Sequence, residues 1–190
     1  EDARDYNIIG CVEPQKSGKT EGWHDAAFFN MCRPLEMVFT NGYDRGVPAS
    51  IQTGNVEDFQ TFDEFYDAYK KQMNYNISLL VNADNAIDMA HMTLCPLPFE
   101  SCMVDDCMKR GLSVQEGGAV YNFTGPQGFG IANVADSLYT VKKLVYEEKK
   151  ITAHELLKAL EMNFGQGFDA ITAREVALQA ADELRAAGKE

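Results

Sequence analysis

A thiol and a carboxylate stand two positions apart near the start of the chain, in the run Gly10-Cys11-Val12-Glu13-Pro14. The preceding run, Tyr6-Asn7-Ile8-Ile9, has the composition of a β-strand. Side chains two positions apart on an extended segment point to the same side, so one loop would aim the Cys11 sulfur and the Glu13 carboxylate at the same small molecule. The alternative is a buried structural cysteine beside a solvated glutamate, because free Cys often behaves as a small core hydrophobe.

Further motifs favour the chemical interpretation. They are Gly10-Cys11-Val12-Glu13-Pro14-Gln15, Gly22-Trp23-His24, Phe28-Phe29-Asn30, Pro98-Phe99-Glu100-Ser101 leading into Val104-Asp105-Asp106-Cys107, and the runs 117–128 and 130–138. In order and spacing these motifs resemble the active-site region of the glycyl radical enzymes, the pyruvate formate-lyase-like family. The resemblance covers roughly residues 5 to 164.

The resemblance implies a role for each member of the pair. Cys11 would carry a transient thiyl radical that removes a hydrogen atom from a substrate carbon, and Glu13 would act as general base on the hydroxyl of that carbon. Burial beside Cys11 would move the pKa of such a base toward the operating pH. Val12 stands where the pyruvate-cleaving branch carries a second cysteine, so formate–acetyl chemistry is not expected. The C-x-E form fits the eliminating lyase and dehydratase branch.

Several substrates remain open within that branch. The overall pattern of residues 11 to 45 favours a two-carbon hydroxy compound such as isethionate, with sulfite as the leaving group. Choline trimethylamine-lyase, glycerol or propanediol dehydratase, hydroxyproline dehydratase and arylacetate decarboxylase are the alternatives. Candidate pocket residues are Trp23, His24, Ala27 and Phe28. His24 suits either a hydrogen bond to a substrate oxygen or a packed position near a helix start, and Phe28 also suits core packing.

Composition excludes other classes of function. The net charge of −12 over 190 residues argues against non-specific binding to nucleic acid or to an anionic membrane surface. No apolar run approaches the ~20 residues that cross a bilayer. The five cysteines have neither disulfide-scaffold nor zinc-site spacing, and the three histidines are scattered, so no metal site is expected. A reduced cytoplasm is the expected setting, with a bacterial microcompartment as the alternative.

Apolar spacing and turn residues predict a helix-rich α/β segment. Capping boxes, in which a Thr and a Glu three positions later cap the first turn, begin at Thr61, Thr152 and Thr172. Strands are expected at 6–9 and 119–124, and loops at 16–22, 41–48 and 125–130. Helices are expected at 23–40, with Pro34 bending or restarting the first, and at 62–94, 99–109, 132–149, 152–163 and 172–187.

The family fold is a ten-stranded α/β barrel, and the chain resembles its central part. Residues 1–164 are expected to form that part with the Cys loop, and residues 165–190 a divergent helical tail. No glycyl radical motif is found, so the chain alone is expected to bind no cofactor and to be inactive. Its expected partners are the rest of the enzyme, which supplies the glycyl radical, a radical S-adenosylmethionine activating enzyme, a small-molecule substrate and a second copy in a homodimer. A non-catalytic remnant or scaffold is the alternative.

Overall fold

The computed structural model describes residues 2–10 and 12–162. The described chain divides into two compact units. The first unit contains residues up to 29 together with residues 78–129. The second unit contains residues 30–77 and those from 130 onward, and the division falls inside the longest helix.

The second unit is helical. It contains α1 (Cys32–Phe39), the first half of α2 (Phe62–Leu94), α5 (Ile131–Val141), the π-helix η4 (Lys142–Glu147) and α6 (Ala153–Glu161). Apolar positions of these elements meet in one core, and Phe65 at its centre is fully buried. The 3-10 turn η2 (Val56–Asp58) and the short hairpin of β5 (Tyr43–Asp44) and β6 (Val47–Pro48) complete the unit.

Two predicted capping boxes define helix starts in this unit. The Glu64 N–H donates to Thr61 Oγ1 at 3.3 Å, and the Thr61 N–H donates to the Glu64 carboxylate at 3.2 Å. Thr152 and Glu155 repeat the arrangement at α6. Each box satisfies amides that a helix start otherwise leaves without partners. The predicted helix at 62–94 is confirmed as α2, and the third box, at Thr172, lies outside the described residues.

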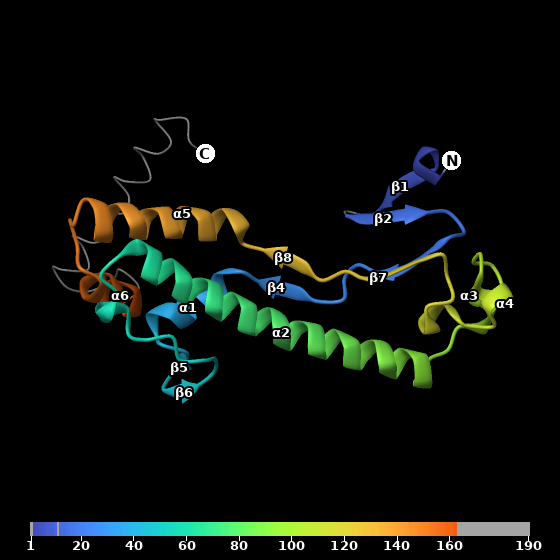
Figure 1. Ribbon diagram of the computed structural model, residues 1–190, viewed down its shortest axis with the longest axis horizontal. Coiled ribbons are helices and arrows are strands. Elements are labelled where there is room, and N and C mark those ends of the chain that lie inside the picture. The colour runs from blue at the N-terminus through green and yellow to red at the C-terminus, as the bar shows by residue number, and fades with distance from the viewer. Residues whose placement is uncertain (1, 11, 163–190) are drawn as a thin grey trace. The chain divides into compact units, whose positions relative to one another are not determined.

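The first unit contains short strands and the second half of α2 (Figure 1). Strands β1 (Tyr6–Ile9) and β2 (Glu13–Lys16) form an antiparallel hairpin, and β3 (Thr20–Trp23) pairs in parallel with β7 (Tyr121–Thr124). Strand β4 (Phe28–Asn30) pairs with β8 (Gln127–Phe129). The helical turn η1 (Asp2–Arg4) precedes β1, and the helical turns α3 (Pro98–Ser101), α4 (Cys107–Arg110) and η3 (Val114–Glu116) lie between α2 and β7 in sequence.

The predicted helix at 23–40 is wrong over its first half. Residues 23–30 end β3, make a turn and form β4, and the helix is confined to Cys32–Phe39. Pairing with distant strands overrides the local helical spacing: Trp23 ends β3, which pairs with β7, and residues 28–30 form β4, which pairs with β8. Pro34 occupies the first turn of α1, where its missing N–H removes no helical hydrogen bond.

Other segments also differ from prediction, mostly because strands occur where loops were expected. The expected loop at 16–22 contains the end of β2 and most of β3, and the expected turn at 125–130 contains β8. The strand predicted at 119–124 starts at Tyr121 and is half exposed rather than buried. The helix predicted at 99–109 is split into α3 and α4, because Asp106 adopts a left-handed φ of 74° immediately before α4.

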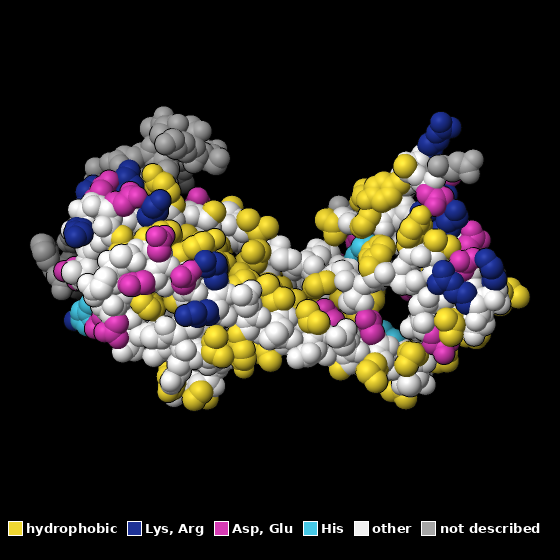
Figure 2. Space-filling view, in the orientation of Figure 1, with side chains coloured by type: hydrophobic (Ala, Val, Ile, Leu, Met, Phe, Trp, Pro, Cys, Tyr) yellow, Lys and Arg dark blue, Asp and Glu magenta, His cyan; other side chains and the backbone are white. Residues whose placement is uncertain are grey.

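Apolar side chains reach the surface of the first unit. Tyr6, Ile8, Ile9 and Val12 of the β1–β2 hairpin are each at least half exposed, and Figure 2 shows apolar side chains at the surface over this hairpin. Soluble domains rarely leave large contiguous apolar patches uncovered unless another segment or molecule binds there. In the described part of the chain, no helix combines the length and apolar character needed to cross a membrane.

Candidate active site

The β1–β2 hairpin carries the predicted thiol and carboxylate. Ile9 pairs with Glu13, so the three residues between them form the hairpin loop. Cys11 is the middle residue of this loop and lies outside the described residues. Gly10 and Val12 belong to the turn and only Glu13 begins β2. The hairpin therefore replaces the extended segment from which the common direction of the two side chains was predicted.

The Glu13 carboxylate folds back over this loop. Its Oε2 atom accepts a hydrogen bond from the Val12 N–H at 2.9 Å. Gly10 has a φ of 66°, and a Cβ atom there would lie 2.4 Å from the same oxygen. Only glycine combines that backbone conformation with such close approach. Gly10 and Val12 thus hold the carboxylate against the turn that contains position 11.

Trp23 ends β3 and is anchored by a polar contact. Its indole Nε1–H donates to Asp88 Oδ1 at 2.7 Å. The His91 ring lies edge-on to the indole, with centroids 5.2 Å apart. Trp23 therefore joins β3 to α2, and its N–H is already used.

His24 is 8% exposed and packs edge-on against Phe123 of β7, with ring centroids 4.4 Å apart. Its Nδ1 atom lies 3.1 Å from the Gly22 carbonyl oxygen. A carbonyl only accepts, so Nδ1 carries a proton. Within the described residues the buried Nε2 atom has no hydrogen-bond partner. The site thus has a packed histidine with one ring nitrogen that contacts no polar group of the described chain.

The turn after His24 is held by Gln127. The Gln127 N–H donates to the Ala27 carbonyl at 2.7 Å, and its side-chain Nε2 donates to the His24 carbonyl at 3.2 Å and also to the Asp25 carboxylate. Ala27 is half-buried. Phe28 is 66% exposed, so core packing of this side chain is not observed in the described chain.

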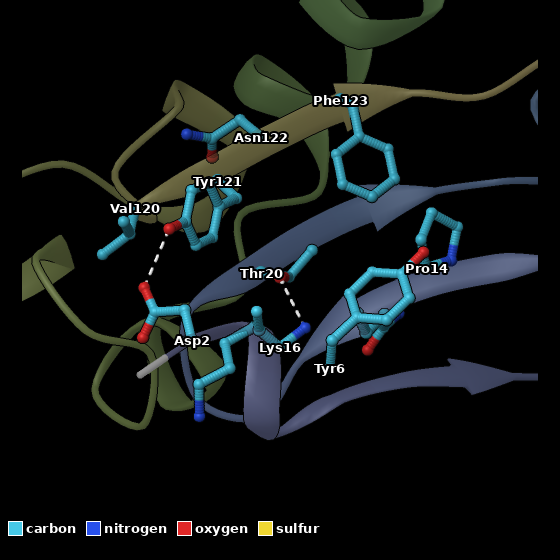
Figure 3. Close-up of a pocket in the computed structure, with 11 residues that line it drawn as sticks. Asp2, Tyr6, Pro14, Lys16, Thr20, Val120, Tyr121, Asn122 and Phe123 are labelled. Atoms are coloured by element: carbon cyan, nitrogen blue, oxygen red, sulfur yellow. Dashed lines mark hydrogen bonds between the residues drawn. The ribbon is translucent and has the colours of Figure 1, made fainter.

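A cavity of about 700 Å³ lies between the β1–β2 hairpin and the β3–β7 sheet. Figure 3 shows Asp2 and Tyr121 on one side of it, and Tyr6, Pro14 and Phe123 on the other. The Tyr121 hydroxyl donates to Asp2 at 2.8 Å, and Lys19 binds the same carboxylate at 2.7 Å. These two donors hold the pKa of Asp2 below its usual value, Lys19 having the larger effect. The side of the cavity formed by Tyr6, Pro14 and Phe123 is apolar.

A second cavity of about 550 Å³ lies where β3 faces the end of α2, lined by Trp23, Glu21 and His91 among others. Burial raises the pKa of Glu21, and the nearby Glu100 carboxylate adds to the rise. Within the described residues, no group of three histidine, cysteine or acidic side chains could hold a metal ion.

Sequence reasoning missed the groups that hold the candidate residues in place. Asp88 lies in the helix predicted at 62–94 from its apolar spacing, and no role was predicted for it. Asp84, four positions before it, is 6% exposed in the structure. Two acidic residues four apart lie on one helix face, and that spacing was the available signal. Nothing local could identify Gln127 or Asp25 as partners, because 102 positions separate them.

Comparisons with known proteins identify the family. The sequence model described as "PFL-like: Pyruvate formate lyase-like" matches residues 1–187. A solved structure concerning 1,2-propanediol dehydration in Roseburia inulinivorans is 68% identical and covers 95% of this chain, with a TM-score of 0.86. The glycerol-bound, B12-independent glycerol dehydratase of Clostridium butyricum is 49% identical and covers 96% of this chain, with a TM-score of 0.83.

Curated relatives agree with the solved structures. The (2S)-3-sulfopropanediol dehydratase of Klebsiella oxytoca is 40% identical over 166 residues, which are 86% of this chain and 20% of that protein. Isethionate sulfite-lyases match at lower identity, 31% for that of Oleidesulfovibrio alaskensis. The chain spans 25% of the Roseburia protein and 26% of the Clostridium protein.

These likenesses confirm the predicted fold and the predicted family. The structural neighbours are glycyl radical enzymes and dehydratases, so the described residues are a helix-rich segment of that α/β barrel. The matched residues also include the whole hairpin around Cys11 and Glu13. The chain belongs to the pyruvate formate-lyase-like family of glycyl radical enzymes, in its branch of eliminating lyases and dehydratases.

Proposed function

We propose that this chain forms the Cys-loop part of a glycyl radical dehydratase that removes water from a small vicinal diol. The observation that carries the proposal is the Glu13 carboxylate, held at the hairpin turn that contains position 11. A base and a hydrogen-abstracting thiol on one turn match the two groups that radical elimination from an alcohol requires. Identity of 68% to the protein of the propanediol dehydration study supports the substrate class.

A glycyl radical on another segment of the enzyme would take the hydrogen atom of the Cys11 thiol and leave a sulfur radical. Val12, the next residue, is 50% exposed. The Cys11 sulfur takes the hydrogen atom from the hydroxyl-bearing C1 and becomes a thiol. Glu13 removes the proton of the C1 hydroxyl, the C2–O bond breaks, and that proton goes with the leaving hydroxide as water. The radical left on C2 recovers the hydrogen atom from the thiol, which gives an aldehyde and restores the sulfur radical.

Glu13 acts here as a positioned base, a role that typically contributes 10²–10⁴-fold to a rate. Its removal of the hydroxyl proton makes the β-carbon–oxygen bond far easier to break. The turn of residues 23–28, which includes the candidate pocket residues His24 and Ala27, forms part of the pocket wall in this proposal. Cys11, Glu13, Trp23, His24, Ala27 and Phe28 keep their proposed roles as site residues, with Trp23 acting through its contact with Asp88.

A diol is proposed as the substrate in place of the isethionate expected from the sequence. Both substrates have a carbon with hydrogen and hydroxyl next to a carbon with a leaving group, so the Cys11–Glu13 pair does not distinguish them. The higher identity to proteins named for propanediol and glycerol than to isethionate sulfite-lyases favours the diol. Choline remains an outcome of the test below.

The proposal includes the partners that such chemistry needs. They are a radical S-adenosylmethionine activating enzyme, the segment that carries the glycyl radical, and a second copy of the enzyme in a homodimer. The cytoplasm, or a microcompartment within it, is the proposed location. Inactivity of the isolated chain also stays a prediction.

The test is turnover by the anaerobically activated enzyme that contains this chain. Propane-1,2-diol, glycerol, isethionate and choline are supplied separately, and aldehyde, sulfite and trimethylamine are assayed. We expect propanal from propane-1,2-diol without sulfite or amine from the other substrates. Sulfite from isethionate with no aldehyde from either diol would overturn the proposal and restore the sulfonate substrate.

A further inference from the structure

Asp88 is a carboxylate with both oxygens committed to the ends of two strands. Its Oδ1 atom accepts the Trp23 indole N–H at 2.7 Å, and its Oδ2 atom accepts the Thr124 hydroxyl at 2.6 Å. Asp88 is on α2, Trp23 ends β3 and Thr124 ends β7. One side chain therefore fixes two strand ends to a helix within the first unit.

The two strand ends are paired residues. Trp23 and Thr124 are the last pair in the parallel register of β3 with β7. The next residue, Gly125, donates its N–H to the Trp23 carbonyl at 2.9 Å. A Cβ atom on Gly125 would lie 3.0 Å from the His24 Cα atom, so the backbones are in close contact beyond the last pair. Asp88 thus acts at the point where the chain leaves the sheet and enters the turn of residues 23–28.

The contacts of Asp88 favour an orienting role over a charge-pairing role. Among the described residues its hydrogen-bond partners are these two neutral donors, and no lysine or arginine forms an ion pair with it. The Trp23 indole N–H can only donate and the Thr124 hydroxyl can donate or accept. An amide at position 88 would satisfy both groups, since its oxygen accepts from Trp23 and its NH₂ donates to Thr124. A methyl group would satisfy neither.

We propose that Asp88 is a positioning residue for the dehydration, which fixes the turn of residues 23–28 relative to the β3–β7 sheet. The inference rests on the proposed function, because that turn is taken there as a pocket wall. In this proposal Asp88 takes no part in making or breaking bonds. It acts through Trp23 and Thr124, so its loss should misplace the substrate and leave the thiol and the base in place.

The variants Asp88→Ala and Asp88→Asn separate position from charge. We expect Asp88→Ala to raise KM about tenfold, since small misplacements in a site cost 10–100-fold. Asp88→Asn should stay within about threefold of wild type, because the amide preserves both hydrogen bonds. Activity is normalised to glycyl radical content from electron paramagnetic resonance. A variant that only lowers the amount of folded enzyme reduces the total rate before this normalisation and leaves KM unchanged. Asp67→Asn, which removes an exposed carboxylate from the same helix, is the control.

Two milder variants keep the test decisive if Asp88→Ala does not fold. Trp23→Phe and Thr124→Val each remove one donor to Asp88, and each should raise KM by less than Asp88→Ala does. Assays use whichever of the four substrates the wild type consumes, so failure of the diol proposal shows in the wild type alone. Unchanged KM in folded Trp23→Phe and Thr124→Val would overturn the inference. Equal losses in Asp88→Ala and Asp88→Asn would also overturn it, in favour of a role for the charge.

Discussion

Different interactions stabilise the interior of each of the two units. In the second unit, Val38, Phe65 and Leu144 are at most 1% exposed and belong to one continuous apolar core. In the first unit the buried apolar cluster is small, with Cys107, Val114 and Ala119 at its centre. Polar contacts such as those of Asp88 and Asp2 join the strands of the first unit instead.

Because of this difference, we expect the second unit to contribute more to stability and the first unit to contribute more to the reaction. Apolar burial contributes about 1.5–3 kcal/mol for each large side chain, whereas a single hydrogen bond contributes a net 0.5–1.5 kcal/mol. Polar contacts are weaker but directional, and directional contacts are what a reacting pair of groups needs. Substitutions in the first unit should therefore change the reaction, and substitutions in the second should change the free energy of unfolding.

Loss of the thiol should have the largest effect. Cys11→Ser is expected to abolish turnover in the complete activated enzyme while the glycyl radical still forms, since a serine hydroxyl does not take over hydrogen-atom transfer. Radical content is measured by electron paramagnetic resonance and product by an aldehyde assay. Cys95→Ala and Cys102→Ala, at exposed cysteines of the first unit, serve as controls and should keep activity. A Cys11→Ser variant with a tenth of the wild-type rate would refute hydrogen transfer by this sulfur.

Loss of the base should come next. Glu13→Gln keeps the size of the side chain and its acceptor oxygen but cannot take a proton, so a loss of about 10²–10⁴-fold in kcat per radical is expected. Asp5→Asn is the matched control, because it removes a carboxylate that pairs with Lys16 of the same hairpin. A near-normal rate for Glu13→Gln would mean that the leaving group departs without this base.

A substitution in the core of the second unit should change stability and leave the kinetics unchanged. Phe65 is fully buried and contacts the rings of Phe39, Phe59 and Phe62. Phe65→Ala should lower the free energy of unfolding by about 3–5 kcal/mol without changing KM in the enzyme that remains folded. Denaturant unfolding measures the first quantity and steady-state kinetics the second. Phe28→Ala, at a 66% exposed ring, should leave stability nearly unchanged. A raised KM in Phe65→Ala would remove the distinction between the units.

Local signals predicted the second unit better than the first. The capping boxes at Thr61 and Thr152 fixed the starts of α2 and α6, because side chain and amide lie within three residues. The helices there follow apolar spacing that one core explains. The strand at β7 was predicted within two residues, whereas β3 was missed, because its pairing with β7 joins residues about 100 positions apart. Local spacing alone made residues 23–30 resemble a helix.

The candidate site shows the same limit. The types and spacing of Cys11 and Glu13, together with the family resemblance, predicted a reacting pair, and the family comparisons confirmed the branch to which the chain belongs. The residues that hold the site were missed because their roles depend on folded geometry. Asp88 is 65 positions from Trp23, and Gly10 is significant only because the Glu13 carboxylate folds back against it.

Among Cys11, Glu13 and Gly10, substitution of Gly10 by alanine should have the smallest effect on the reaction. A comparison with Gly18 distinguishes backbone strain from displacement of the Glu13 carboxylate. Gly10 and Gly18 both have a left-handed φ, 66° and 70°, so alanine at either position costs about 1–2 kcal/mol. A Cβ atom at Gly10 would collide with the Glu13 carboxylate, whereas nothing lies within 4 Å of one at Gly18. Gly10→Ala should therefore lower kcat per radical by up to about 10²-fold through misplacement of the base. Gly18→Ala should lose similar stability and keep its rate, as denaturant unfolding and aldehyde assays will measure. Equal kinetic losses in both variants would mean that strain in the first unit, and not the position of Glu13, limits the reaction.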